Sequence, residues 1–260
     1  MLESFLSSLF PNQLCVLFGV SLTLFAAAEI GYRMGARVPP KEDHAFQNEI
    51  SGYQSAVLGL LALLLGFTFS MALNHYNLRC SLIIQEANSI GTTWLRTSFL
   101  PGETREISRK LLRDYVTYRV NQDIPGSDHQ EDLRQISILQ KALWKQVETA
   151  ASTAPNPITA SYITSLNETF DLASTRLAAH RVRVPGALWM ILMIVSIFGI
   201  WSSGFSSGVN GRRALFLTVG LPILITLVLL LITDLSSPKR GLIRTDYSSM
   251  TDLRDSINQP

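Results

Sequence analysis

Four stretches without a single Asp, Glu, Lys or Arg constrain this chain most strongly. They cover residues 4–28, 50–78, 184–211 and 214–233. A helix that crosses a bilayer needs about 20 predominantly apolar residues, and each stretch is long enough for one. The composition agrees, because only 16% of the residues are charged, whereas an average soluble protein has about 25%. We therefore expect a multi-pass membrane protein.

The predicted membrane helices form two hairpins on either side of a polar segment. Residues 75–183 hold more than half of the charged side chains of the chain. Proline and glycine breaks divide this segment into four stretches, and each has apolar residues at helical spacing. No alternation typical of strands is present. The predicted fold is all-α, with four transmembrane helices near 12–32, 54–74, 184–203 and 214–233.

Four parts follow from this arrangement: a first transmembrane hairpin over 1–74, a helical extramembrane domain over 75–183, a second transmembrane hairpin over 184–235, and a C-terminal tail over 236–260. The apolar stripes of the polar segment predict the core of the extramembrane domain. The stripe residues are Ile83, Ala87, Ile90 and Trp94; Ile107, Leu111, Tyr115 and Tyr118; Leu133, Ile136, Leu139, Leu143 and Val147; and Tyr162, Leu166, Phe170, Ala173 and Leu177.

The second predicted span runs directly into polar sequence. The stretch "LLALLLGFTFSMALNHYNLR", residues 60–79, begins apolar and ends polar, and no proline lies between residues 55 and 100. We therefore expect one long helix that continues out of the membrane. At the return to the membrane, Pro185 leaves two alternatives open, because proline is tolerated in the first turn of a helix. It either begins a new helix or kinks a long one.

No constellation typical of an enzyme is present. The four histidines are scattered without metal-ligand spacing, and the two cysteines form no framework. Sequence motifs for nucleophilic catalysis or phosphate binding are absent. The net charge of +2 is too small to indicate nucleic-acid binding. We expect no enzymatic activity, no cofactor, no metal site and no nucleic-acid partner.

The second span carries a stripe of small residues, Ser55, Gly59, Ala62, Gly66 and Ser70. One interpretation is close packing against a neighbouring span, which small residues permit. The other is a pore, in which copies of the helix surround an axis and bulky apolar side chains beside the stripe narrow it. A constriction of that kind gates by dewetting.

Glu86 lies beside the apolar stripe of the helix that continues the second span. A carboxylate near the buried edge of a helix requires a partner, and Arg79 and Arg96 are the candidates. Glu86 and Arg96 are therefore predicted as a structural pair or as part of an ion-contacting vestibule.

Several motifs together resemble a known family. The central motif is "LGLLALLLGFTFSMALNHYNLRCSLIIQEANSIGTTWLR", followed by "LLRDYVTYRV"; "AEIGYRMG" ends the first span and "DLSSPKRGLIR" follows the fourth. These sequences resemble the bestrophin-like family of bacterial membrane proteins, whose function is uncharacterised. That family is more distantly similar to bestrophins, which are pentameric anion channels with a hydrophobic neck on the second membrane helix.

The resemblance implies positions for the pore. The neck falls at Gly59, Leu63 and Phe67, and the polar end of the pore at Asn74, His75 and Arg79, where Asn74 and Arg79 would attract or coordinate ions. Two features of bestrophins do not carry over. The Arg-Trp-Trp element after the neck is absent, and the acidic calcium clasp after the fourth span lacks its acidic cluster. Asp234, Pro238 and Gly241 keep only its outline.

Two functions from different classes remain in view. The first is a homo-oligomeric, pentameric ion channel of the bacterial inner membrane, with chloride as the ion that the resemblance implies. The second is a non-conducting scaffold or sensor that binds a partner through its helical domain.

The side of the membrane on which the extramembrane domain lies depends on which basic residues are counted. Counts of basic residues in short loops favour the outside, and adding the arginines beside the membrane favours the cytoplasm. We expect it in the cytoplasm.

Overall fold

The computed structural model describes residues 13–38, 44–121, 129–153, 156–211, 213, 216–236, 243 and 245–259. Within these ranges the regular structure is helical and no strand occurs, so the all-α prediction is confirmed for the described part of the chain. The helices are α2 (Gln13–Gly35), α3 (His44–Arg96), α4 (Gly102–Asn121), α5 (His129–Thr153), α6 (Pro157–Arg181), α7 (Gly186–Val209), α8 (Leu221–Ser236) and α9 (Ser248–Asn258). A 3₁₀ turn, η1 (Thr97–Phe99), follows α3, and a π-helical turn, η2 (Phe216–Gly220), precedes α8.

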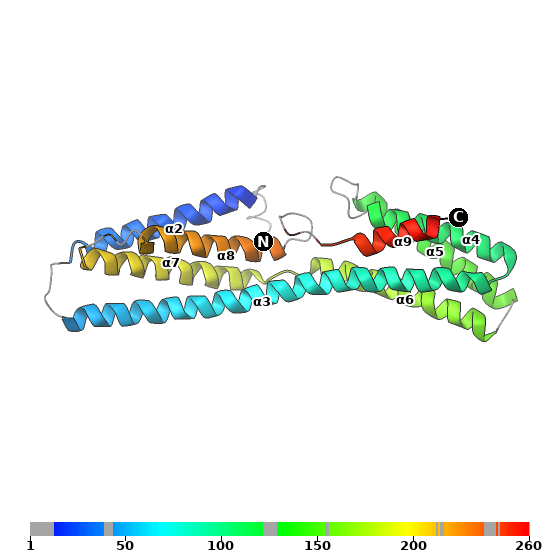
Figure 1. The fold of residues 1–260 in the computed structure, drawn as a ribbon, viewed down its shortest axis with the longest axis horizontal. Coiled ribbons are helices and arrows are strands. Elements are labelled where there is room, and N and C mark those ends of the chain that lie inside the picture. The colour runs from blue at the N-terminus through cyan, green and yellow to red at the C-terminus, as the bar shows by residue number, and fades with distance from the viewer. Residues whose placement is uncertain are drawn as a thin grey trace. The chain divides into compact units, whose positions relative to one another are not determined.

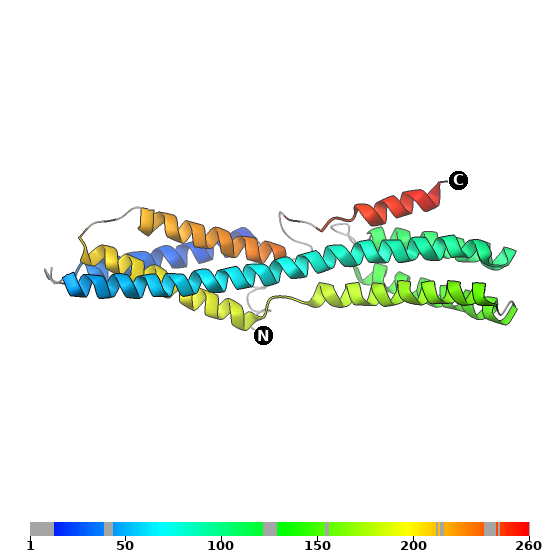
Figure 2. The same cartoon turned by 60° about the horizontal axis from the view of Figure 1, so that its bottom comes forward.

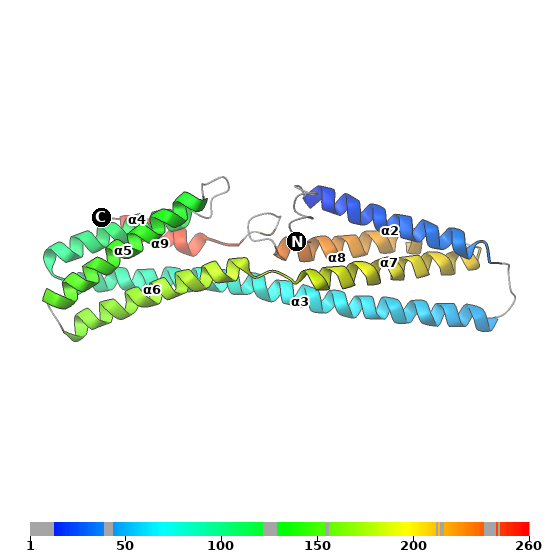
Figure 3. The same ribbon diagram turned by 180° about the vertical axis from the view of Figure 1, so that it is seen from behind.

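The chain divides into two compact units. Unit 1 contains α2, α3 up to Asn74, α7, η2 and α8 (Figure 1), and unit 2 contains α3 from His75 onward, α4, α5, α6 and α9 (Figure 3). Helix α3 belongs to both units, and Figure 2 shows it as one unbroken ribbon. Its 53 residues correspond to about 80 Å of helix. The predicted continuation of the second span into polar sequence is therefore confirmed.

Three stretches of the described residues are long and apolar enough to cross a membrane: Asn48–Phe99, Pro157–Val209 and Thr218–Ser236. The first two contain the predicted second and third spans, and the last overlaps most of the predicted fourth span. The first predicted span coincides with α2, which is not among the three, so the count of four spans stays a prediction. Between α6 and α7 the backbone is extended at Val182 and Pro185. Of the two alternatives at Pro185, the structure has a new helix that begins after the proline.

Close packing of α2 against α7 organises unit 1. Gly31 and Gly35 on α2 face the backbone of α7, while Gly204 and Gly208 on α7 face the backbone of α2. A Cβ atom at any of these four positions would collide with a carbonyl oxygen of the other helix. Glycine is required here because the two backbones approach closely, as in small-xxx-small contacts between membrane helices. The core around this contact includes Leu24, Leu61, Leu192, Ile200 and Ile225.

The core of unit 2 follows the predicted apolar stripes. Ile83, Leu112, Tyr115, Leu143 and Tyr162 are fully buried at its centre. One predicted core residue, Ile107, is exposed instead.

The region expected to be a C-terminal tail contains α9, which sequence reasoning missed. Met250 and Ile257 of this helix are buried in the core of unit 2. Their spacing, with Leu253 between them, is that of an amphipathic helix, so a signal for α9 was present in the sequence.

Candidate functional site

The predicted neck residues lie on a side of α3 that no described residue of unit 1 covers. The side chains of Leu63 and Phe67 are 55% and 66% exposed. A Cβ atom placed on Gly59 meets no described atom within 4 Å. The opposite side of α3 is packed, because Leu61 and Ala72 are buried. The structure therefore brings the three predicted positions onto one uncovered face of one helix.

The stripe of small residues is uncovered as well. Ser55, Ala62 and Ser70 are exposed, and a Cβ atom on Gly66 would also meet open space. The stripe therefore does not pack against another described span of the same chain.

The residues predicted at the polar end of the pore differ in exposure. Asn74 is exposed and His75 is half-buried, but Arg79 is 1% exposed. Burial lowers the pKa of the Arg79 guanidinium, against the opposing effects of the nearby Cys80, Tyr247 and Tyr76. A guanidinium keeps its proton at any physiological pH. Arg79 therefore places a positive charge inside unit 2 and does not present it to solvent.

Glu86 forms the main charged cluster of unit 2. Its carboxylate accepts two hydrogen bonds from Arg119, one from Nε and one from Nη2, each 2.6 Å long. Arg176 Nη1 donates a third at 2.9 Å. All three side chains are buried. Burial by itself raises the pKa of Glu86, but the charges and hydrogen bonds of Arg119 and Arg176 outweigh it, so the pKa falls below its usual value.

The predicted pairing of Glu86 with Arg79 or Arg96 is wrong. Arg96 instead donates a hydrogen bond of 2.8 Å to the backbone carbonyl of Ser161. The true partners lie 33 and 90 residues from Glu86 in sequence. They are brought to it by the packing of α4 and α6, which local spacing on α3 does not reveal.

Aromatic side chains enclose this cluster. The guanidinium of Arg176 lies 5.6 Å from the ring centroid of Tyr247, which directly precedes α9. Burial raises the pKa of Tyr115 to about 12, with a smaller contribution from the charge of Glu86. Among the described residues of unit 2, the buried groups that are charged at neutral pH are three guanidiniums and one carboxylate. Their formal charges sum to +2.

Between residues 75 and 95 the solvent side of α3 carries no charged side chain, and it combines polar side chains with the exposed Leu78, Ile84 and Leu95. Between residues 50 and 95 the only charged residues in the sequence are Arg79 and Glu86, and both are buried. From residue 74 to residue 95 the exposed polar side chains are Asn74, Asn77, Gln85, Asn88 and Thr92.

The region after the fourth predicted span was compared above with a calcium clasp. The described residues hold no acidic cluster of the kind that such a clasp requires. They contain no group of three His, Cys, Asp or Glu side chains that could hold a metal ion. Asp234 is buried near the end of α8, and its Oδ2 accepts a hydrogen bond of 2.8 Å from the backbone N–H of Ile243. Pro238 and Gly241 lie outside the described residues.

The all-helical units and the long apolar helices define a helical membrane protein. The family model of the bestrophin-like domain matches residues 22–250, and the chain belongs to the bestrophin-like family. Membership assigns it to channel-like membrane proteins, as the motif resemblance predicted. Comparisons with curated proteins and with solved structures gave no match.

Proposed function

We propose that the protein is a homo-oligomeric ion channel, with five copies of α3 arranged around a central pore. The observation that carries the proposal is the uncovered face of α3, which holds Gly59, Leu63 and Phe67. In a ring of copies this face turns toward the axis. The family match supports the same architecture.

Leu63 and Phe67 form the constriction in this account. A narrow ring of apolar side chains excludes water and blocks ions until it widens. Gly59 adds no side chain, so the constriction is limited to the two bulky positions. The regular geometry of an α-helix places Leu63 and Phe67 about one turn apart along α3.

Anion preference arises from charges behind the pore wall. The pore-facing amides are neutral, whereas the buried Arg79, Arg119 and Arg176 outweigh Glu86. A charge about one helix diameter away, roughly 10 Å, changes the energy of a passing ion by roughly 1.7 kcal/mol at an effective dielectric constant of about 20. This is enough to favour chloride over a cation without a charged group in the lumen.

Unit 1 occupies the bacterial inner membrane in this proposal, with four spans near 12–32, 54–74, 184–203 and 214–233. Unit 2 lies in the cytoplasm. Three of these spans rest on long apolar helices of the structure, and α2 supplies the fourth.

Ion flux into liposomes tests the proposal. Purified protein is reconstituted, and chloride and potassium gradients are applied separately. We expect chloride flux to exceed potassium flux, and Phe67→Ala to raise it because the constriction loses its largest side chain. Phe18→Ala is the matched control, since Phe18 on α2 is also exposed but is not assigned to the pore. Equal flux in wild type and Phe67→Ala would remove Phe67 from the constriction.

A partner-binding scaffold is the second candidate. Leu95 and Phe99 are large apolar side chains of unit 2 that are 69% and 66% exposed. A second copy of the chain covers them in the channel, and a different protein covers them in the scaffold. The mass of the purified protein in detergent separates the two, because a pentamer supports the channel and a monomer without flux supports the scaffold.

A further inference from the structure

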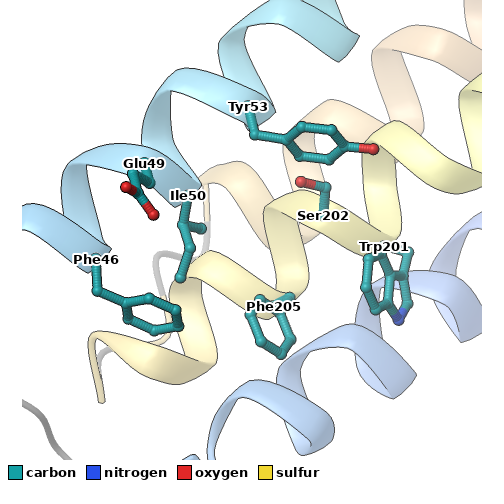
Figure 4. A pocket seen from close by; sticks show the side chains of 7 residues that line it. All are labelled: Phe46, Glu49, Ile50, Tyr53, Trp201, Ser202 and Phe205. Atoms are coloured by element: carbon teal, nitrogen blue, oxygen red, sulfur yellow. The ribbon is translucent and has the colours of Figure 1, made fainter.

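An open surface cavity of about 290 Å³ lies in unit 1 between the beginning of α3 and the last turns of α7. Its size is at the lower end of the range for small-molecule sites. Figure 4 shows the side chains of α3 extending toward those of α7. The lining residues are Phe46, Glu49, Ile50 and Tyr53 from α3, and Trp201, Ser202 and Phe205 from α7.

The lining combines aromatic rings with one carboxylate. Four of the seven residues are aromatic, and none is Lys or Arg. The rings of Trp201 and Phe205 stack with centroids 5.6 Å apart. The negative faces of aromatic rings attract a cation, and quaternary ammonium groups are a common ligand of aromatic side chains. Glu49 adds a full negative charge, so the chemistry of the cavity fits an ammonium group.

The position of the cavity indicates that this ammonium belongs to a lipid. Glu49 is the last charged residue before the uncharged stretch of α3 that begins at residue 50. The cavity thus lies at the end of a predicted span, where lipid head groups are found. Exposed apolar side chains continue from it along both helices, at Leu60, Ile194 and Phe198. The ring of Phe198 contacts that of Tyr53 edge to face, with centroids 6.2 Å apart, which joins the cavity to this apolar surface.

We propose that the cavity binds the head group of a phospholipid that carries an ammonium group, with an acyl chain along the exposed apolar side chains of α3 and α7. The ammonium lies among the aromatic rings and close to the Glu49 carboxylate. The head-group site on α3 lies before Gly59, the first predicted neck position. The proposal does not require that the protein conduct ions.

Native mass spectrometry of the full chain in detergent tests the proposal. Three lipids with identical acyl chains are compared, with ethanolamine, choline and glycerol head groups. We expect the two ammonium lipids to bind roughly fivefold more tightly than the glycerol lipid, the size of one favourable cation–π contact. Glu49→Gln and Tyr53→Leu should each reduce this preference severalfold. Glu168→Gln, an exposed carboxylate in unit 2, should leave it unchanged.

Two results would overturn the proposal. The first is equal binding of all three head groups to the wild-type protein, which would make the aromatic residues a nonspecific interfacial belt. The second is an undiminished preference in both Glu49→Gln and Tyr53→Leu. Tyr53 is half exposed, so its replacement does not threaten the fold. Tyr53→Phe should keep the preference for ammonium head groups, because the aromatic ring remains.

Discussion

Replacing Glu86 by Gln should strongly destabilise unit 2. The substitution keeps the shape of the side chain but leaves Arg119 and Arg176 buried without the carboxylate that they share. Breaking a buried ion pair by removing one partner costs about 3–5 kcal/mol, because an uncompensated charge remains in the interior. We expect a loss of this size in the free energy of unfolding. Glu168→Gln, at an exposed position on α6, is the matched control and should change it by less than about 0.5 kcal/mol.

Hydrogen exchange in urea, followed by mass spectrometry on peptides from α4 and α6, reports on unit 2 within the full-length protein. A second variant, Glu86→Leu with Arg119→Met, separates the charge from the packing. The double variant should lose less free energy of unfolding than the sum of the losses in Glu86→Leu and Arg119→Met alone. The reasoning would be refuted if Glu86→Gln lost less than about 1 kcal/mol, or if the double change were additive.

The pH dependence of stability provides a second readout of the same cluster. The pKa of Glu86 is lower in the folded protein than its usual value of 4.5. Its stabilising contribution is therefore fully present above that value, and it is lost as the pH falls through the folded pKa. The wild type should lose stability below about pH 4.5, and Glu86→Gln should lack this part of the dependence.

Three further predictions concern other parts of the molecule. Gly204→Leu should prevent stable packing of α2 against α7 and lower the thermal unfolding midpoint, because any side chain at this position meets the α2 backbone. Gly52 faces open space, so Gly52→Leu should leave the midpoint unchanged. Arg79→Gln should lower the chloride-to-potassium flux ratio in liposomes by up to roughly tenfold, and Arg134→Gln, at an exposed ion pair on α5, should not. Met250→Ala should lower the free energy of unfolding of unit 2 by about 2–5 kcal/mol, measured by hydrogen exchange, because this side chain of α9 is fully buried.

The sequence predicted the features that depend on local pattern. The long uninterrupted α3 and the burial of Ile83 and Ile90 follow from helical periodicity and the absence of proline. The burial of Arg79 could have been predicted in the same way. It precedes Ile83 by four residues and Glu86 by seven, so helical phase places it on the packed side of α3.

The features that sequence reasoning missed depend on contacts between distant segments. The partners of Glu86 come from α4 and α6, and nothing within α3 identifies them. The cavity beside Glu49 requires that the beginning of α3 meet the end of α7, about 150 residues later. Periodicity within one helix shows which face is apolar, but it does not show which distant helix covers that face.

The most direct test of the central claim is water accessibility along α3 in a conducting protein. Cys15 and Cys80 are first replaced by Ser, and single cysteines are then introduced at Leu63, Ser70 and Asn74 on the uncovered face, and at Leu61 on the packed face. We predict that a charged, water-soluble thiol reagent alters chloride flux at the three uncovered positions and has no effect at Leu61. Unchanged flux at all three uncovered positions, in protein shown to be modified, would contradict the proposal that this face of α3 lines the pore.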